Sequence, residues 1–132
     1  VKSVEKTAEL HKLLLGTEIP TFSEPPRQPI FPADSTWYRT ARPRYGHVQL
    51  ANARIELMEP VGGESRWREY LAKNGQGIEH LGFAVADVKA AKERFIKAGG
   101  KLIMGGCDGC TAHIDMRESL GYIVELMPAP RQ

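Results

Sequence analysis

The chain has 132 residues, of which 42% are hydrophobic and 26% are charged, and its formal net charge is +2. These values fit one globular domain of ordinary size and exclude a collagen-like repeat, a disulfide scaffold and a wholly disordered chain. Each half of the chain holds 9 basic and 8 acidic residues, so neither nucleic acid nor an anionic membrane is indicated as a partner. The sequence shows no apolar run long enough to span a membrane, no secretory signal and only two cysteines, which favours a cytoplasmic protein.

Local signals along the chain predict a mixed α and β domain. Ser3 and Asp87 are suited to cap helices, because a side-chain oxygen at that position accepts from the free N–H groups of the first turn. Gly16 is placed to end the first of these helices. A proline-rich stretch that follows cannot be helical and is a poor central strand. The predicted elements are, in chain order, helix 2–15, strand 17–22, loop 23–36, an extended segment 37–40, strands 45–51 and 54–59, helix 64–74, strand 78–86, helix 87–98, and strands 101–104, 111–116 and 122–127.

An internal repeat divides these elements into two halves. Residues 1–8 match residues 85–92 at an offset of 84. The halves also close alike, with Ile55-Glu56-Leu57-Met58 in the first and Val124-Glu125-Leu126-Met127 in the second. The second half has the pattern strand, helix and three strands, and the first half has the same pattern without its opening strand. We therefore expect the native protein to begin upstream of Val1.

Three polar side chains on predicted strands are candidates for chemistry. Alternation along a strand places Glu56 and Glu125 on the face opposite their apolar neighbours, at equivalent positions of the two halves. By the same alternation His80 shares a face with the small residues Gly82 and Ala84, which leave room around the imidazole. A lone Glu or His on a strand is usually a solvated or hydrogen-bonded group, but the repetition of the carboxylate favours a functional role.

The paired modules resemble the vicinal oxygen chelate superfamily, which includes glyoxalase I, methylmalonyl-CoA epimerase, extradiol dioxygenases and bleomycin-resistance proteins. The segments Ile55-Glu-Leu-Met-Glu-Pro-Val and Tyr70 to His80-Leu-Gly-Phe-Ala-Val are most similar to those of methylmalonyl-CoA epimerases. The resemblance implies an α+β fold in which two βαβββ modules form a half-barrel metal cavity. It divides a single domain into module one (1–60), a linker helix (61–76) and module two (77–128).

The resemblance also implies a divalent metal ion held by the first and last strands of each module. On this chain those positions are Glu56, His80 and Glu125, and a fourth ligand would lie upstream of Val1. Two carboxylates with one or two imidazoles suit Ni, Co, Zn, Mn or Fe. Such a site implies a lyase or isomerase that acts on a small carbonyl or thioester substrate by metal-assisted proton abstraction, with Glu125 as both ligand and base.

The strand antiparallel to Glu56 departs from the epimerase pattern. Epimerases of this family carry a Glu base there, whereas residues 47–51 contain no carboxylate. A two-residue turn at Asn52-Ala53 would place Gln49 opposite Glu56, with His47 on the same face. We therefore expect His47 to be the proton carrier of this strand and Gln49 to contact substrate.

Two further residues are expected to contact substrate. If the last hairpin pairs Met116 with Tyr122, His113 lies opposite Glu125 and lines the cavity. Trp37, with nearby arginines, is interpreted as part of a rim that holds a substrate carboxylate or phosphate. Cys107 and Cys110 are interpreted as loop residues, because no helix start follows them and no second cysteine pair completes a zinc site.

Other functions fit the same resemblance. A non-catalytic protein of the resistance type would bind a small molecule in the cavity without turnover. A dioxygenase is less favoured, because Glu56 stands where the usual oxygenase pattern has a second histidine. Members of the superfamily commonly dimerise, so a homodimer is expected.

Overall fold

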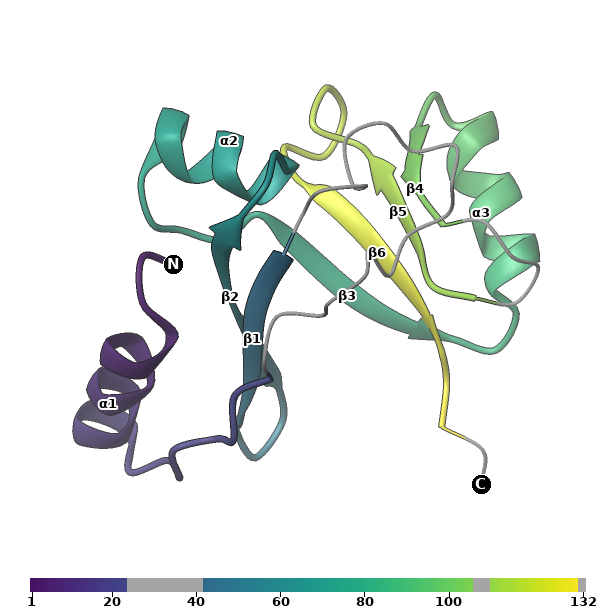
Figure 1. Cartoon of the computed structure of the whole chain (residues 1–132). Helices are drawn as coiled ribbons and strands as arrows, with labels where there is room; N and C mark the ends of the chain where they lie inside the picture. Colours follow the sequence, from purple (N-terminus) through teal and green to yellow (C-terminus); the bar gives the residue numbers. More distant parts are fainter. Residues whose placement is uncertain (24–41, 106–109, 131–132) are drawn as a thin grey trace. The chain divides into compact units, whose positions relative to one another are not determined.

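The computed structural model describes residues 1–23, 42–105 and 110–130, which belong to two compact units, Val1–Gly77 and Ile78–Gln132 (Figure 1). In the described residues unit 1 combines a sheet with two helices and unit 2 combines a sheet with one, so the predicted mixed α+β fold is confirmed. None of the helices in the described part of the chain is long and apolar enough to cross a membrane.

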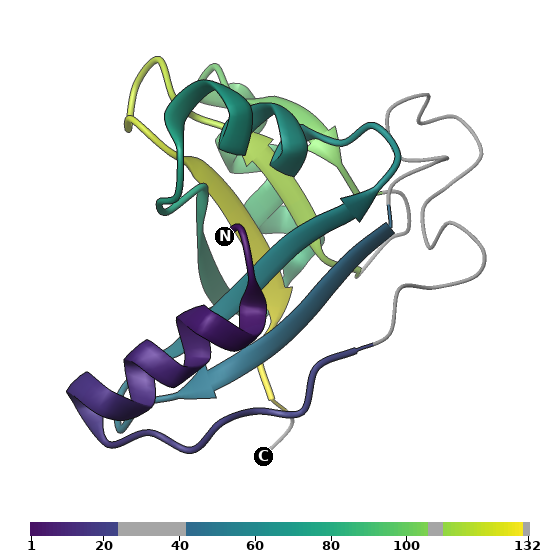
Figure 2. The same ribbon diagram turned by 60° about the vertical axis from the view of Figure 1, so that its left-hand side comes forward.

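Unit 1 is built on an antiparallel hairpin, and its first helix lies along one face of that hairpin (Figure 2). Val4 and Ala8 of the helix pack against Val48 and Leu57 of the two strands, and all four side chains are buried. This packing explains why the helix forms where the apolar spacing predicts it. The elements of unit 1 are α1 (Val4–Leu15), β1 (Arg42–Gln49), β2 (Arg54–Gly62) and α2 (Arg66–Asn74).

The start of α1 is held by two side chains. The Ser3 hydroxyl accepts a hydrogen bond from the Lys6 N–H at 3.3 Å, as predicted for the N-cap. The Glu59 carboxylate of β2 accepts from the Val4 N–H at 3.0 Å, so negative charge lies at the positive end of the helix. Gly16 ends the helix in the left-handed conformation, with φ of 67°.

The hairpin differs from its prediction by one residue in the turn. The Leu50 N–H donates to the Ala53 carbonyl at 2.9 Å, so the two-residue turn falls at 51–52 and not at 52–53. Moving the turn by one residue moves the register by two, because both strands shift. Glu56 is therefore paired with His47, and Gln49 is paired with Arg54.

The predicted strand over residues 17–22 is wrong. Residues 17–23 contain no strand, and the segment meets β1 only at its end, where the Ser23 N–H donates to the Tyr45 carbonyl at 2.8 Å. The ring of Phe22 lies so close to Gly46 that a Cβ there would be 2.6 Å from it. The Tyr45 N–H also donates to the Ser23 hydroxyl at 3.1 Å, so the segment is anchored by the Phe22 ring and by two hydrogen bonds at Ser23 instead of a ladder.

Unit 2 is a complete βαβββ module with a four-stranded sheet in the order β3-β6-β5-β4. The first strand runs parallel to the last, and the other pairs are antiparallel. Asp87 caps the helix as predicted, since its carboxylate accepts from the Ala90 N–H at 2.9 Å. The elements are β3 (His80–Val85), α3 (Val88–Lys97), β4 (Lys101–Met104), β5 (Ala112–Asp115) and β6 (Ile123–Pro128).

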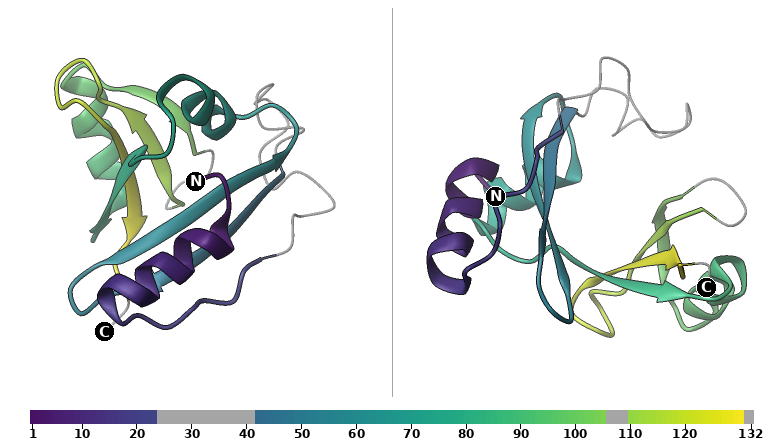
Figure 3. Two further views of the ribbon diagram at one scale, coloured as in Figure 1. Left: turned by 90° about the vertical axis from the view of Figure 1, so that its left-hand side faces the viewer. Right: turned by 90° about the horizontal axis from the view of Figure 1, so that it is seen from below.

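The helix α3 lies against one face of this sheet, over β5 and β6 (Figure 3). By alternation Leu81 and Phe83 of β3 share a face with Val85, but they are 39% and 41% exposed. Their strand is at the end of the sheet order, beyond the reach of the helix, and only Val85 packs against the core. The buried residues of this core are Val88, Ala91, Ala112, Ile114, Met116, Val124 and Leu126.

Candidate active site

Glu125 lies at the centre of a polar cluster in unit 2. Its strand neighbours Val124 and Leu126 are fully buried in the core that α3 covers, so alternation directs the carboxylate to the other face of the sheet. There one oxygen is 3.3 Å from His113 Nε2 and the other is 3.5 Å from His80 Nε2. His113 lies directly opposite Glu125 on β5, which confirms the predicted register of this hairpin.

The two imidazoles of the cluster contact one another as well. The rings of His80 and His113 have centroids 5.1 Å apart and meet edge to face at 63°. The side chain of His113 is 4% exposed, and that of His80 is 14% exposed. His80 Nδ1 is 2.7 Å from a carboxylate oxygen of Glu79, the residue that precedes the strand. The cluster is therefore a chain of four groups that runs from Glu79 through His80 and Glu125 to His113.

Gly82 gives the Glu125 carboxylate its space. A Cβ at this position would lie 3.3 Å from Glu125 Oε2 and 2.8 Å from the Met127 methyl group. Gly82 is paired with Glu125 on the adjacent parallel strand, so any larger side chain would push against the carboxylate. The small residue predicted beside His80 thus opens room on the face that carries the cluster.

The surroundings of Glu125 keep it ionised. Burial alone would raise the pKa of this carboxyl, but hydrogen bonds from His113 and His80 outweigh burial and hold the pKa well below its ordinary value. An ionised carboxylate beside two imidazoles can bind a cation or exchange a proton with a neighbour.

Unit 1 carries a second histidine–carboxylate pair. His47 on β1 lies opposite Glu56 on β2, and the two side chains approach to 3.3 Å between Nε2 and Oε1. The His47 ring also meets Tyr45 edge to face, at 6.0 Å between centroids. Both members of the pair are about one-third exposed. The proton carrier proposed from the sequence therefore contacts the proposed metal ligand directly.

The structure places Gln49 away from Glu56. Its amide donates to the carbonyls of Leu50 and Ala53, and so it ties down the hairpin turn. The interpretation of Gln49 as the residue that faces Glu56 is wrong, because the turn lies one residue earlier than predicted.

Trp37 and Cys107 lie outside the described residues. Cys110 is disulfide-bonded.

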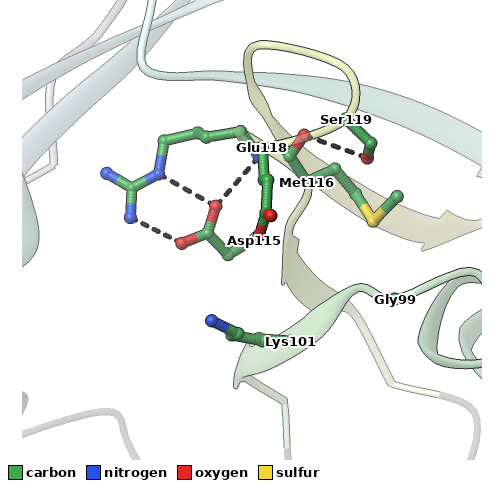
Figure 4. A pocket seen from close by; sticks show the side chains of 7 residues that line it. Gly99, Lys101, Asp115, Met116, Glu118 and Ser119 are labelled. Atoms are coloured by element: carbon green, nitrogen blue, oxygen red, sulfur yellow. Dashed lines mark hydrogen bonds and ion pairs between the residues drawn. The ribbon is translucent and has the colours of Figure 1, made fainter.

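A small pocket of unit 2 adjoins the end of β5 (Figure 4). Its volume is about 190 Å³, and an ion pair between Asp115 and Arg117 forms part of the wall. The guanidinium lowers the pKa of the Asp115 carboxyl to about 2. Asp115 lies two residues after His113 on β5, and its carboxylate is occupied by Arg117. The residues that line the pocket are Gly99, Lys101, Asp115, Met116, Arg117, Glu118 and Ser119.

Sequence reasoning missed Glu79. Strand periodicity identifies His80 but says nothing about a residue just before the strand, and a contact between adjacent side chains is not one that alternation predicts. The available signal was the adjacency of a carboxylate to an imidazole in Glu79-His80. Such a pair is the usual arrangement behind a metal-binding histidine.

The candidate ligand atoms are of the types that bind a divalent cation. In the segments 1–23, 42–105 and 110–130, no three His, Cys, Asp or Glu side chains already form a metal-binding group, and the imidazoles contact Glu125 instead. Unit 2 nevertheless presents an imidazole nitrogen of His80 and a carboxylate oxygen of Glu125 side by side, over the space left by Gly82. Unit 1 presents the carboxylate of Glu56. Nitrogen and oxygen donors of this kind suit borderline divalent ions.

Residues 1–116 match the family described as the Glyoxalase/Bleomycin resistance protein/Dioxygenase superfamily. The chain belongs to this superfamily. The match covers most of both units and confirms the resemblance that the sequence motifs indicate.

Individual relatives are epimerases. The chain is 36% identical over 86 residues to an ethylmalonyl-CoA/methylmalonyl-CoA epimerase from Cereibacter sphaeroides; the alignment covers 60% of the chain and 64% of the relative, less than two-thirds of its length. The crystal structure of methylmalonyl-CoA epimerase from Mycobacterium tuberculosis has a TM-score of 0.69 at 22% identity, covering 98% of this chain and 83% of that one. A Streptomyces coelicolor methylmalonyl-CoA epimerase in complex with 2-nitronate-propionyl-CoA has a TM-score of 0.65 at 19% identity, covering 98% and 91%. These structural similarities support the same fold.

Proposed function

We propose that the protein is a metal-dependent epimerase that inverts a carbon next to the carbonyl of a short-chain acyl-CoA thioester such as methylmalonyl-CoA. The observation that carries the proposal is the Glu125 carboxylate, which is held between His80 and His113. Glu125 lies on β6, which pairs with the His80 strand β3 on one side and with the His113 strand β5 on the other. The similarity to an ethylmalonyl-CoA/methylmalonyl-CoA epimerase supports the thioester as the substrate class.

We further propose that His80 and Glu125 of unit 2 hold the divalent ion, and the resemblance to the superfamily adds Glu56 as a third ligand. A bound divalent ion supplies Lewis-acid stabilisation to the negative charge that develops on the thioester oxygen, which is worth several kcal/mol. The chain's own residues then have two tasks: to keep donor atoms ionised and aligned, and to move one proton. The ionised state of Glu125 suits both tasks.

Inversion at a carbon needs one group that removes the proton and another that returns a proton to the other face. Glu125 in unit 2 and His47 in unit 1 are proposed for these roles. The described strand β1 offers no carboxylate, so His47, whose Nε2 lies 3.3 Å from Glu56 Oε1, is the group there that is proposed to carry the proton.

The test uses the full-length protein and methylmalonyl-CoA of defined configuration in D2O. The metal-free protein is loaded separately with Co²⁺, Ni²⁺, Zn²⁺ or Mn²⁺. We expect metal-dependent inversion that incorporates deuterium from the solvent at C2. NMR measures the deuterium, and chiral analysis of the acid measures the inversion. Glu125→Ala, His80→Ala and Glu56→Ala should each abolish it, whereas Glu93→Ala on the exposed side of α3 should not.

His47→Gln separates the two proton-transfer roles. The variant should lose inversion while it still exchanges deuterium into one of the two epimers, because only one of the two groups has been removed. If the wild-type protein binds the thioester but exchanges no deuterium with any of the four metals, the epimerase proposal fails and a sequestering role is indicated. Equal exchange into both epimers by His47→Gln contradicts the role of His47.

A further inference from the structure

The contact between Glu79 and His80 is the shortest polar contact of the unit 2 cluster. Glu79 Oε2 lies 2.7 Å from His80 Nδ1, whereas His80 Nε2 is 3.5 Å from Glu125. The Glu79 and His80 side chains are 11% and 14% exposed, so water competes little for the bond. A contact of this length between an imidazole and a carboxylate is a charge-assisted hydrogen bond.

The chemistry of the two groups fixes which atom donates. An ionised carboxylate can only accept, so the hydrogen of this bond belongs to His80 Nδ1. The other ring nitrogen, Nε2, then faces Glu125. The bond therefore turns Nδ1 toward Glu79 and Nε2 toward Glu125, and it stops the ring from turning over.

We propose that Glu79 is a positioning residue that presents His80 Nε2 to the metal ion. The inference rests on the proposed metal site, and it adds to that site a carboxylate that touches neither metal nor substrate. Glu79 holds the imidazole from behind and raises the basicity of the donor nitrogen, which is how outer-shell carboxylates act on metal-binding histidines.

The contacts around the His80 ring differ in whether they distinguish its two nitrogens. On one side the ring meets the edge of His113 at 5.1 Å between centroids, a contact that a flipped imidazole could also make. On the other side Nε2 lies 3.5 Å from Glu125 Oε2, a longer contact than the one to Glu79. The hydrogen bond to Glu79 is the shortest of the contacts that distinguish the two ring nitrogens.

The experiment compares Glu79→Ala and Glu79→Gln in the full-length protein, with Glu93→Ala as a matched control. Two quantities are measured: Zn²⁺ affinity by competition with a chromophoric chelator, and the His80 Nδ1–H resonance in ¹H–¹⁵N spectra, assigned with His80→Gln. Glu79→Ala should lose the resonance and bind Zn²⁺ roughly ten- to a hundredfold more weakly. Glu79→Gln keeps an oxygen that can accept the bond, so it should retain the resonance and most of the affinity.

Each other result overturns the inference. Wild-type Zn²⁺ affinity in Glu79→Ala shows that orientation by Glu79 is unnecessary. An equal loss of affinity in Glu79→Gln and Glu79→Ala, with the resonance retained in Glu79→Gln, shows that charge alone matters. Circular dichroism spectra matching those of Glu93→Ala exclude misfolding as the cause. Neither measurement uses a thioester, so a protein that binds Zn²⁺ through His80 but epimerises nothing refutes the proposed reaction and leaves this inference intact.

Discussion

His113 and Glu125 lie directly opposite each other on β5 and β6, with 3.3 Å between Nε2 and Oε1. The His113 side chain is almost fully buried, and it is a donor to a carboxylate that is itself largely shielded from water. The pair is therefore a structural element of the sheet as well as a part of the candidate site.

Removal of this donor should destabilise unit 2. In His113→Ala a buried carboxylate oxygen loses a hydrogen bond, so we expect the free energy of unfolding to fall by about 1–3 kcal/mol. Urea denaturation followed by circular dichroism measures the change. His11→Ala on α1 is the control and should change stability by less than about 0.5 kcal/mol. Equal effects of the two substitutions would contradict the structural role of His113.

Gly82→Ala should impair the site without unfolding the protein. The backbone of Gly82 is not in the left-handed region, but the added methyl would lie 3.3 Å from Glu125 Oε2. We expect a fall in catalytic turnover of roughly ten- to a hundredfold, because small displacements of a reacting group are costly. Gly62→Ala, whose added Cβ would make only ordinary contacts, serves as the control. Unchanged turnover in Gly82→Ala would mean that Glu125 needs no such space.

Gly100 is a packing position where an added methyl has nowhere to go. Its Cβ would lie 2.5 Å from Met116 Sδ, 2.6 Å from Ile114 Cγ2 and 2.8 Å from the Phe95 carbonyl. Gly100→Ala should therefore lower the free energy of unfolding by about 1–3 kcal/mol, the usual cost of overpacking. The melting temperature measured by calorimetry should fall clearly below that of Gly62→Ala. A melting temperature equal to that of the control would show that the end of α3 can move away from β5.

The Asp115–Arg117 ion pair should make stability depend on pH only in acid. The folded-state pKa of Asp115 is about 2, below the ordinary value of 3.8, so protonation favours the unfolded chain. The contribution is present in full above pH 3.8 and is lost as the pH falls toward 2. Asp115→Asn should cost at most about 1 kcal/mol at pH 7, and the difference from wild type should vanish near pH 2. Melting curves at several pH values measure it, and a difference that stays constant with pH would contradict the assignment.

Much of the fold follows from local sequence signals. Ser3 and Asp87 were predicted as helix caps from their side chains, and both accept the expected hydrogen bonds. The opposition of His113 and Glu125 followed from the position of the last turn. These features depend on near neighbours in the chain, where propensity and alternation are informative.

Other features depend on contacts that no local pattern encodes. The turn of the β1–β2 hairpin falls at 51–52, and a shift of one residue there exchanged Gln49 for His47 as the partner of Glu56. Alternation along β3 predicts which face of the sheet Leu81 and Phe83 lie on. It does not predict how many strands of that sheet α3 covers. Glu79 was missed because its role arises from the side chain that it touches and not from its place in a period.

The parallel pairing of β3 and β6 joins the first strand of unit 2 to its last. His80 and Glu125 consequently stay far apart until the helix and the two intervening strands have folded between them. A chain that ends before β6 keeps His80 and Glu79 but lacks the Glu125 carboxylate on the other side of the ring. Because such distant pairing is slow to form, tight cation binding should appear only in the final kinetic phase of refolding, and a metal-sensitive dye would then time the closure of the sheet.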